Sequence, residues 1–234
     1  MRTTSHSYNL HNLQNEPFQF LVIDEATQLK EAESTIPLKL PGIMHVVLVG
    51  DECQLSAMVT SVMSAKWEFG RSLFGRLSLL GHLKKLLTNQ YRMHPSISLF
   101  LNHEFYYNQI MDAEYVKSES YEKSYLEGEM FGSYSFIDVA DGREEKDDDR
   151  RSRTNMVEVA VVVTIVKMLH QEWEKSKNKL TIGVVSLYAA QVLHIREKIA
   201  RYEDRDGFLI KVKTIDGFQG GKADIIILST VQSN

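Results

Sequence analysis

The chain has few of the residues that mark secreted, membrane-bound or disulfide-stabilised proteins. Cys53 is the single cysteine among 234 residues, which excludes an internal disulfide framework and fits a reducing compartment. No apolar run approaches the length of about 18 residues that a membrane-spanning helix needs, so we expect none. The N-terminal stretch MRTTSHSYNLHNLQNEP has no apolar core of the signal-peptide kind, so we expect the protein not to be secreted.

An excess of basic charge is also missing. The formal net charge is −4, which gives no global electrostatic footprint for nucleic acid. This argues only weakly against such a partner, because many nucleic-acid motors bind through a local groove. With 43% hydrophobic and 25% charged residues the composition is that of an ordinary globular protein, and the length allows one large or two modest domains.

Apolar runs and helical segments alternate in the first part of the chain. The runs Phe18–Ile23 and His45–Val49 are each followed by acidic residues, and segment 27–40 between them predicts a short helix broken by Pro37 and by Pro41 just after it. Continuous apolar strands of this kind are typical of parallel sheets that are covered by helices. The fold class we expect is therefore α/β, with parallel sheets and flanking helices.

The remainder of the chain predicts more elements of the same kind. Residues 67–87 predict helix and turns packed on the sheet, and residues 96–127 predict connecting helices with an exposed loop. Residues 132–140 alternate like a strand, and the charge run 143–153 is typical of a solvated loop.

A long amphipathic helix is expected over Asn155–Lys175, with Asn155 as its N-cap. Three strands should follow it, at 180–187, 209–214 and 224–231, with a helix at 191–202 between the first two.

FLVIDEA, at residues 20–26, carries the clearest chemical signal. Ligands of open α/β sheets bind at the carboxyl ends of the strands, and two carboxylates stand at that point here. Asp24 would hold Mg²⁺, directly or through water, and Glu25 would orient or activate an attacking water. The same pair could instead be the acidic first turn of a helix.

Two further motifs bear groups suited to phosphate. In GDECQL (50–55) Gln54 can both donate and accept, which suits contact with a γ-phosphate or an attacking water, while Asp51 could cap a following helix. In QYRMHP (90–95) Arg92 offers a planar fork of donors matched to phosphate oxygens, or a surface salt bridge. Tyr91 could stack on a base or lie in the core.

A glycine-rich turn separates the last two expected strands. Gly217, Gly220 and Gly221 would allow a ligand to approach the backbone closely, although an ordinary tight turn needs the same residues.

The order DEA, GDxxQL, QYRMHP and TIDGFQG resembles superfamily 1 helicases of the senataxin and nonsense-mediated-decay branch, over nearly all of residues 18–234. LLTNQYRMHPSISLFLNHEFY and FGRSLF look especially like plant senataxin-like members. The resemblance implies a P-loop NTPase (RecA-like) fold. It also implies a disordered N-terminus at 1–17, the C-terminal part of a first RecA-like domain at 18–95 and a second RecA-like domain at 96–234.

The resemblance also implies roles for single residues. Asp24 and Glu25 match the Mg²⁺ ligand and the catalytic base, and Gln54 matches the γ-phosphate sensor. Tyr91 matches an adenine-stacking residue, and Arg92 matches an arginine finger, which is worth on the order of 10³–10⁵ in rate in other nucleotide hydrolases.

Gly217, Gln219 and Gly220 match the motif that couples nucleotide state to the nucleic-acid strand. The implied cofactors are ATP and Mg²⁺, the implied partner is single-stranded RNA or DNA, and the implied location is nuclear or cytoplasmic.

The chain departs from the family pattern at the phosphate-cradling loop, G-x-x-x-x-G-K-[ST]. Its only near match, GFQGGKA at 217–223, is one residue too short, ends in Ala223 instead of a hydroxyl residue and precedes a strand. A second arginine, which the family carries in a motif after TIDGFQG, is also missing. Lys222 stands where the family usually has a glutamate. We therefore expect an incomplete first domain without its middle strand, which exposes sheet edges and apolar faces.

Two functions remain open. The chain is part of an ATP-dependent 5′-to-3′ helicase, inactive alone and completed by a missing upstream segment or an unknown protein partner. Alternatively, it is a truncated, non-catalytic paralogue that acts as a nucleic-acid-binding or protein-interaction module. A metal-binding protein is a poor third, because the eight histidines show no ligand spacing.

Overall fold

The computed structural model describes residues 3–12, 17–128, 130–146, 152–202 and 206–232. It divides into two compact units, Met1–Thr88 and Asn89–Asn234. The division falls before QYRMHP, whereas the sequence places it after residue 95. Tyr91 and Arg92 therefore belong to the second unit. Within the described ranges, no helix combines the length and apolarity that crossing a membrane requires.

The first unit is built around two parallel strands. Strand β1 (Phe20–Ile23) pairs in register with β2 (His45–Leu48), as the apolar runs predict. The helical elements of this unit are α1 (Thr4–Ser7), η1 (Tyr8–Asn12), η2 (Ala26–Gln28), α2 (Glu31–Leu38), α3 (Val62–Lys66) and α4 (Leu73–Leu79).

Two expectations for this unit need correction. Residues Thr4–Asn12 are expected to be disordered but form helical turns. They are ordered because Ser7 is buried and α1 packs on α2. Helix α2 includes Pro37 in its last turn and ends one residue later, so the missing N–H of the proline removes only one helical hydrogen bond. Residues 67–87 form helix and turns as expected, with α-helix over Leu73–Leu79 and Ser72 as its N-cap.

Apolar side chains of this two-stranded sheet face solvent. Ile23 is buried, but Phe20 is 67% exposed and Val22 is 62% exposed. The prediction of a fully buried strand is thus wrong for the residues present, because β1 pairs with β2 alone in the described part of the unit and so lies at the edge of the sheet. The exposure of apolar faces that we expect for an incomplete domain is found.

The second unit begins with short elements around QYRMHP. They are β3 (Asn89–Gln90), α5 (Pro95–Tyr106), β4 (Met111–Asp112), η3 (Glu114–Lys117), η4 (Glu119–Tyr121), β5 (Glu145–Lys146) and β6 (Arg153–Thr154). Strands β3 and β4 are parallel, and β5 and β6 are antiparallel. The charge run thus includes β5 and the first residue of β6, and its residues 147–151 lie outside the described ranges.

The strand expected at 132–140 does not form. Its alternation of apolar and polar residues is real, but Tyr134 and Phe136 are exposed and no neighbouring strand pairs with the segment in the described structure. A period of two residues stabilises a strand only when one face is covered and the backbone finds a partner.

The core of the second unit lies between a three-stranded parallel sheet and two helices. Strand β7 (Leu180–Ser186) lies between β8 (Phe208–Thr214) and β9 (Ile225–Ser229). These three strands confirm the expected ones to within two residues at each end.

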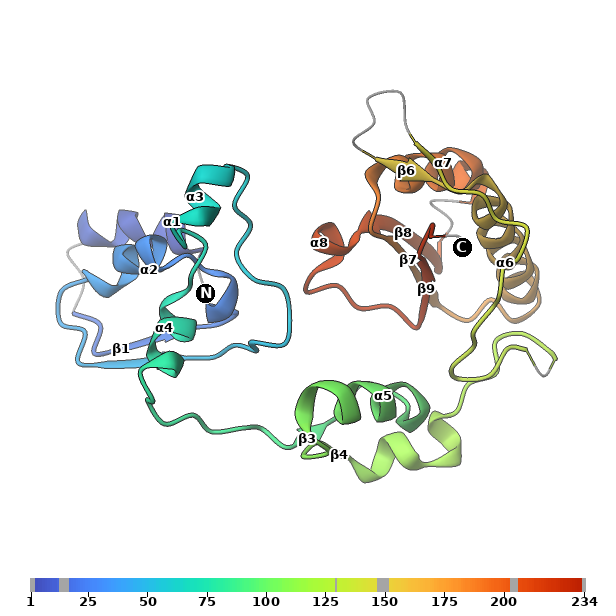
Figure 1. Cartoon of the computed structure of the whole chain (residues 1–234). Coiled ribbons are helices and arrows are strands. Elements are labelled where there is room, and N and C mark those ends of the chain that lie inside the picture. Colours follow the sequence, from blue (N-terminus) through green and yellow to red (C-terminus); the bar gives the residue numbers. More distant parts are fainter. Residues whose placement is uncertain (1–2, 13–16, 129, 147–151, 203–205, 233–234) are drawn as a thin grey trace. The chain divides into compact units, whose positions relative to one another are not determined.

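Two helices cover one face of this sheet. They are α6 (Met156–Ser176) and α7 (Ala189–Ile199), the latter extended by η5 (Ala200–Tyr202). Figure 1 shows both on one side of the sheet and the short α8 (Ile215–Phe218) on the other. The buried side chains of α6 and α7 form a single cluster with those of the strands, which include Ile182, Val184 and Ile210. Asn155 is the N-cap of α6, as predicted, and its side chain accepts a hydrogen bond from the Glu158 N–H.

Candidate functional site

The carboxyl ends of β1 and β2 bring the first two motifs together. Ile23 lies opposite Leu48, and the Val49 N–H donates to the Ile23 carbonyl at 2.8 Å. The Ala26 N–H then donates to the Val49 carbonyl, also at 2.8 Å. Parallel pairing therefore places the DEA and GDECQL turns side by side at one edge of the sheet, as ligand sites in α/β proteins require.

Asp24 and Glu25 do not form the acidic first turn of a helix. Glu25 has φ 53°, in the left-handed region, and it precedes η2 without a capping hydrogen bond from its side chain. The Glu25 N–H donates to Asp24 Oδ1 at 3.0 Å, and Gln28 Nε2 donates to Glu25 Oε2 at 2.8 Å. Both carboxylates are exposed at the end of the strand. Left-handed backbone at a residue other than glycine is costly and is common at functional sites.

Asp51 orders the neighbouring turn and does not cap a helix. Its Oδ1 accepts from the Cys53 N–H at 3.0 Å, and its Oδ2 accepts from Gln54 Nε2 at 2.7 Å. Asp51 thus holds the amide group of Gln54, whose side chain remains exposed. This bond leaves the Gln54 carbonyl oxygen available as an acceptor and occupies one of the amide's two donors.

The pKa values of Glu52 and Cys53, the two residues between Asp51 and Gln54, are both shifted. The hydrogen bond from Lys84 lowers the pKa of the Glu52 carboxyl. The same ion pair links the turn to the segment after α4. Desolvation and then the charge of Asp51 raise the pKa of the Cys53 thiol. The thiol is therefore protonated at neutral pH, which does not favour a nucleophilic role.

The carboxylates at this edge could bind Mg²⁺ only together with a phosphate ligand. The described residues contain no cluster of three or more histidine, cysteine or acidic side chains that could hold a metal by themselves. Mg²⁺ usually keeps several waters and binds through one or two carboxylates together with substrate phosphates. Asp24 is exposed and is one carboxylate that could hold the ion in this way.

The QYRMHP segment of the second unit presents Tyr91 and Arg92 to solvent. The Arg92 guanidinium makes no ion pair with the residues that the structure describes, which does not support the surface salt bridge considered above. Tyr91 is 57% exposed and is therefore not a core residue. Its ring stacks at 6.4 Å on Tyr115, with 21° between the planes. An exposed, braced ring is suited to stack on a base.

The glycine-rich turn of TIDGFQG begins with α8 and ends in a left-handed glycine. Thr214 caps α8 by accepting from the Gly217 N–H at 3.3 Å. Gly220 has φ +69° and open space around it, so its backbone can be approached closely. Gln219 is exposed. The turn follows the carboxyl end of β8 and crosses to β9 on the other side of β7, and the carboxyl ends of strands are where open α/β sheets bind ligands.

The eight predicted residues fall into two sets. Asp24, Glu25 and Gln54 share the edge of β1 and β2 in the first unit, and the others belong to the second unit. Sequence reasoning missed Gln90 and Asp112, whose side chains hold the Arg92 segment. Gln90 is the first residue of QYRMHP, in which the sequence singles out only Tyr91 and Arg92. Asp112 lies in a segment without a recognisable motif.

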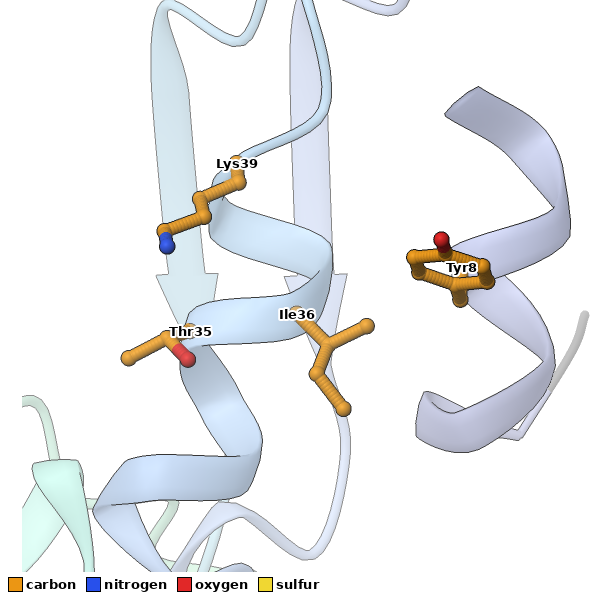
Figure 2. A pocket seen from close by; sticks show the side chains of 4 residues that line it. All are labelled: Tyr8, Thr35, Ile36 and Lys39. Carbon is orange, nitrogen blue, oxygen red and sulfur yellow. The ribbon is translucent and has the colours of Figure 1, made fainter. Parts of the chain in front are cut away.

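A shallow hollow elsewhere in the first unit is separate from these residues. Figure 2 shows Tyr8 of η1 facing α2, from which Thr35 and Ile36 project, with Lys39 at the end of that helix. None of the predicted site residues lines it. It does not contribute to the candidate site.

Two family models, both described as AAA domain, match residues 2–62 and 69–234. The chain is 35% identical over 224 residues to Helicase SEN1 of Saccharomyces cerevisiae. The chain belongs to the superfamily 1 helicases of the senataxin and nonsense-mediated-decay type. The Regulator of nonsense transcripts 1 homolog of Arabidopsis thaliana is 34% identical over 229 residues, and Probable helicase MAGATAMA 3 of the same plant is 32% identical over 222 residues.

These matches cover 93%, 95% and 94% of this superfamily 1 helicase chain, respectively. They cover only 10%, 18% and 27% of those relatives in the same order. The chain therefore spans a small part of their length. Yeast and plant relatives match about equally well, so identity does not single out the plant members. Membership of these families implies the P-loop NTPase fold, and nucleotide and nucleic-acid binding are the general properties of such helicases.

Proposed function

We propose that this chain supplies the γ-phosphate side of a helicase ATPase site and part of its track for single-stranded nucleic acid. The observation that carries the proposal is the pairing of β1 with β2, which puts Asp24, Glu25 and Gln54 at one sheet edge. The fold that we propose is two RecA-like domains, the first of which lacks its phosphate-cradling strand and loop. The translocation that we infer runs 5′ to 3′, by analogy with the family.

Each residue has a separable task in this proposal. The exposed Asp24 carboxylate would hold Mg²⁺ against the nucleotide phosphates, where the ion supplies charge neutralisation. Glu25 orients the attacking water through the carboxylate that Gln28 steadies. Gln54, held by Asp51, contacts the water or the γ-phosphate.

Two residues of the second unit have their own tasks in this proposal. Arg92 neutralises charge that develops on the transferred phosphoryl group, and Tyr91 stacks on the base. Gly217, Gln219 and Gly220 couple the nucleotide state to contact with the nucleic-acid strand. We infer that ATP and Mg²⁺ are the cofactors, that single-stranded RNA or DNA is the partner, and that the protein acts in the nucleus or cytoplasm.

The 234 residues contain no phosphate-cradling loop, so we propose that the chain alone hydrolyses little or no ATP. Without that loop there are no backbone N–H groups, lysine or hydroxyl to bind the β- and γ-phosphates. The test is an ATPase assay of the chain with single-stranded RNA, beside Glu25→Gln. Both proteins should match the buffer background, and robust turnover that depends on Glu25 would overturn the proposal of inactivity.

A second candidate is a non-catalytic binding or interaction module. The exposed Phe20 and Val22 on β1 favour it, because exposed apolar faces of a sheet are places where another protein segment can pack. Anisotropy of a labelled single-stranded oligonucleotide separates the two candidates. The helicase-derived proposal expects binding of the oligonucleotide that weakens with salt, whereas a protein-interaction module expects no binding.

A further inference from the structure

The side chain of Gln90 is the centre of a hydrogen-bonded clamp on the Arg92 segment. Its Oε1 accepts from the Arg92 N–H at 2.9 Å and from the Met93 N–H at 2.8 Å. Its Nε2 donates to the Met93 carbonyl at 2.8 Å and to Asp112 Oδ1 at 2.6 Å. Both donors and both acceptor positions of one amide are thus in use.

Asp112 determines which way this amide faces. The two residues are register partners in the β3–β4 pair, and an ionised carboxylate can only accept hydrogen bonds. The Gln90 NH₂ group must therefore point to Asp112, which turns Oε1 toward the Arg92 and Met93 amides. Ser98, which is 4% exposed, also donates to Asp112 Oδ1, at 2.7 Å, and so fixes the carboxylate itself.

The other side of the Arg92 peptide is held as well. Tyr121 donates from its hydroxyl to the Arg92 carbonyl at 2.5 Å, and Tyr115 donates to the Tyr91 carbonyl. The backbone of Arg92 is thus bonded at its N–H and at its carbonyl. Its guanidinium, by contrast, has no hydrogen-bond or ion-pair partner in the described part of the chain.

We infer that Gln90 and Asp112 are positioning residues that hold the Arg92 backbone so that its guanidinium is presented to a phosphate-bearing ligand. The inference rests on the proposed function for the identity of that ligand. The clamp acts by removing backbone freedom before binding, because an arginine on an ordered backbone loses less conformational entropy when it meets phosphate. The guanidinium keeps its donors for the ligand because the clamp uses only main-chain groups of Arg92.

A donor–acceptor exchange tests the clamp in the full chain. Gln90→Glu sets two carboxylates against each other, and adding Asp112→Asn restores a donor opposite an acceptor. Glu119→Gln, which removes an exposed carboxylate of the same region, is the matched control. The first readout is hydrogen exchange of the Arg92 and Met93 amides, which should accelerate about tenfold in Gln90→Glu and return toward the wild-type rate in the double variant.

The second readout is the nuclear magnetic resonance signal of Arg92 Nε–H during titration with inorganic triphosphate. The apparent Kd should rise several-fold in Gln90→Glu, recover in the double variant and stay unchanged in Glu119→Gln. Should Gln90→Glu fail to fold, Asp112→Ala leaves the amide free to turn and should release the same two amides.

The outcomes separate the clamp from the proposed function. Arg92 and Met93 amides that exchange at the wild-type rate in Gln90→Glu and Asp112→Ala would overturn the positioning role. Amides that respond as expected, with no wild-type response of Arg92 to triphosphate, would support the clamp and contradict the phosphate role proposed for Arg92.

Discussion

The ring of Phe218 lies directly over the backbone of Gly183. A Cβ atom added at Gly183 would stand 2.5 Å from Phe218 Cζ and 2.8 Å from Ile226 Cδ1, closer than carbon atoms approach. Phe218 is the last residue of α8, so this contact anchors the glycine-rich turn to the middle of the central strand β7. The face that α6 and α7 leave free is therefore used to place the turn.

Gly183→Ala should destabilise the second unit by about 1–3 kcal/mol, because an extra methyl in this contact forces the ring and α8 to move. Urea denaturation followed by circular dichroism measures the change. Phe218→Leu should remove part of the penalty, so that the two substitutions are clearly non-additive. Gly132→Ala is the control, since a Cβ there has only the Tyr134 carbonyl oxygen nearby, at 3.9 Å. Additive effects of Gly183→Ala and Phe218→Leu would contradict the contact.

Gln191→Met should destabilise the same unit by about 2–4 kcal/mol while keeping a similar volume. Gln191 is fully buried and accepts from the Asn155 N–H at 2.9 Å while donating to Ser229 Oγ, also at 2.9 Å. Glu158 completes the network by accepting from Ser229 Oγ at 2.6 Å. Methionine would leave the buried Asn155 N–H without its partner.

The matched control is Gln171→Met on the exposed side of α6, which should change the free energy of unfolding by less than about 0.5 kcal/mol. A Gln191→Met protein as stable as the Gln171→Met protein would show that the network adds nothing to stability.

Periodicity predicted the second unit better than the first. The runs at β7, β8 and β9 and the stripe of α6 are covered in the chain itself, so local pattern and packing agree. In the first unit Phe20 and Val22 carry the pattern of a buried strand, but the segments present do not cover them. Residues 132–140 show the same limit, since alternation without a partner gives no strand.

The candidate site divides in the same way. Asp24, Glu25 and Gln54 could be placed at one sheet edge from sequence, because parallel strands end together. The Gln90–Asp112 clamp could not, because it joins residues 22 positions apart across two-residue strands that leave no periodic signal.

Stability should fall at high pH through Tyr125. Burial and then the charge of Asp224 raise the pKa of Tyr125 to about 12, above the value of about 10 expected for an unfolded chain. The contribution of the neutral phenol is fully present below pH 10 and is lost as the pH rises toward 12, because the unfolded state loses this proton first. Denaturation midpoints between pH 9.5 and 11.5 should decline less steeply in Tyr125→Phe than in the wild type. The exposed Tyr134→Phe should leave the wild-type slope unchanged.

Glu25→Gly should stabilise the first unit by about 1 kcal/mol, although it removes the carboxylate proposed to orient water. The reason is the left-handed backbone at φ 53°, which costs an L-residue with a Cβ about 1–2 kcal/mol and costs glycine almost nothing. Glu68 shares φ 53° in the same unit, so Glu68→Gly should also raise stability once the loss of its ion pair with Arg71 is allowed for.

Glu33→Gly should instead lower the stability of the first unit, and it is the comparison for Glu25→Gly. Glu33 lies in the first turn of α2, in right-handed helical backbone, where glycine should cost up to about 1 kcal/mol. Hydrogen exchange of β1 and β2 amides in the full chain reports the three changes on one scale. Equal losses from Glu25→Gly and Glu33→Gly would contradict backbone strain at Glu25. A gain at Glu25 alongside a loss at Glu33 would show that a strained backbone is retained at the carboxylate that we propose to orient water.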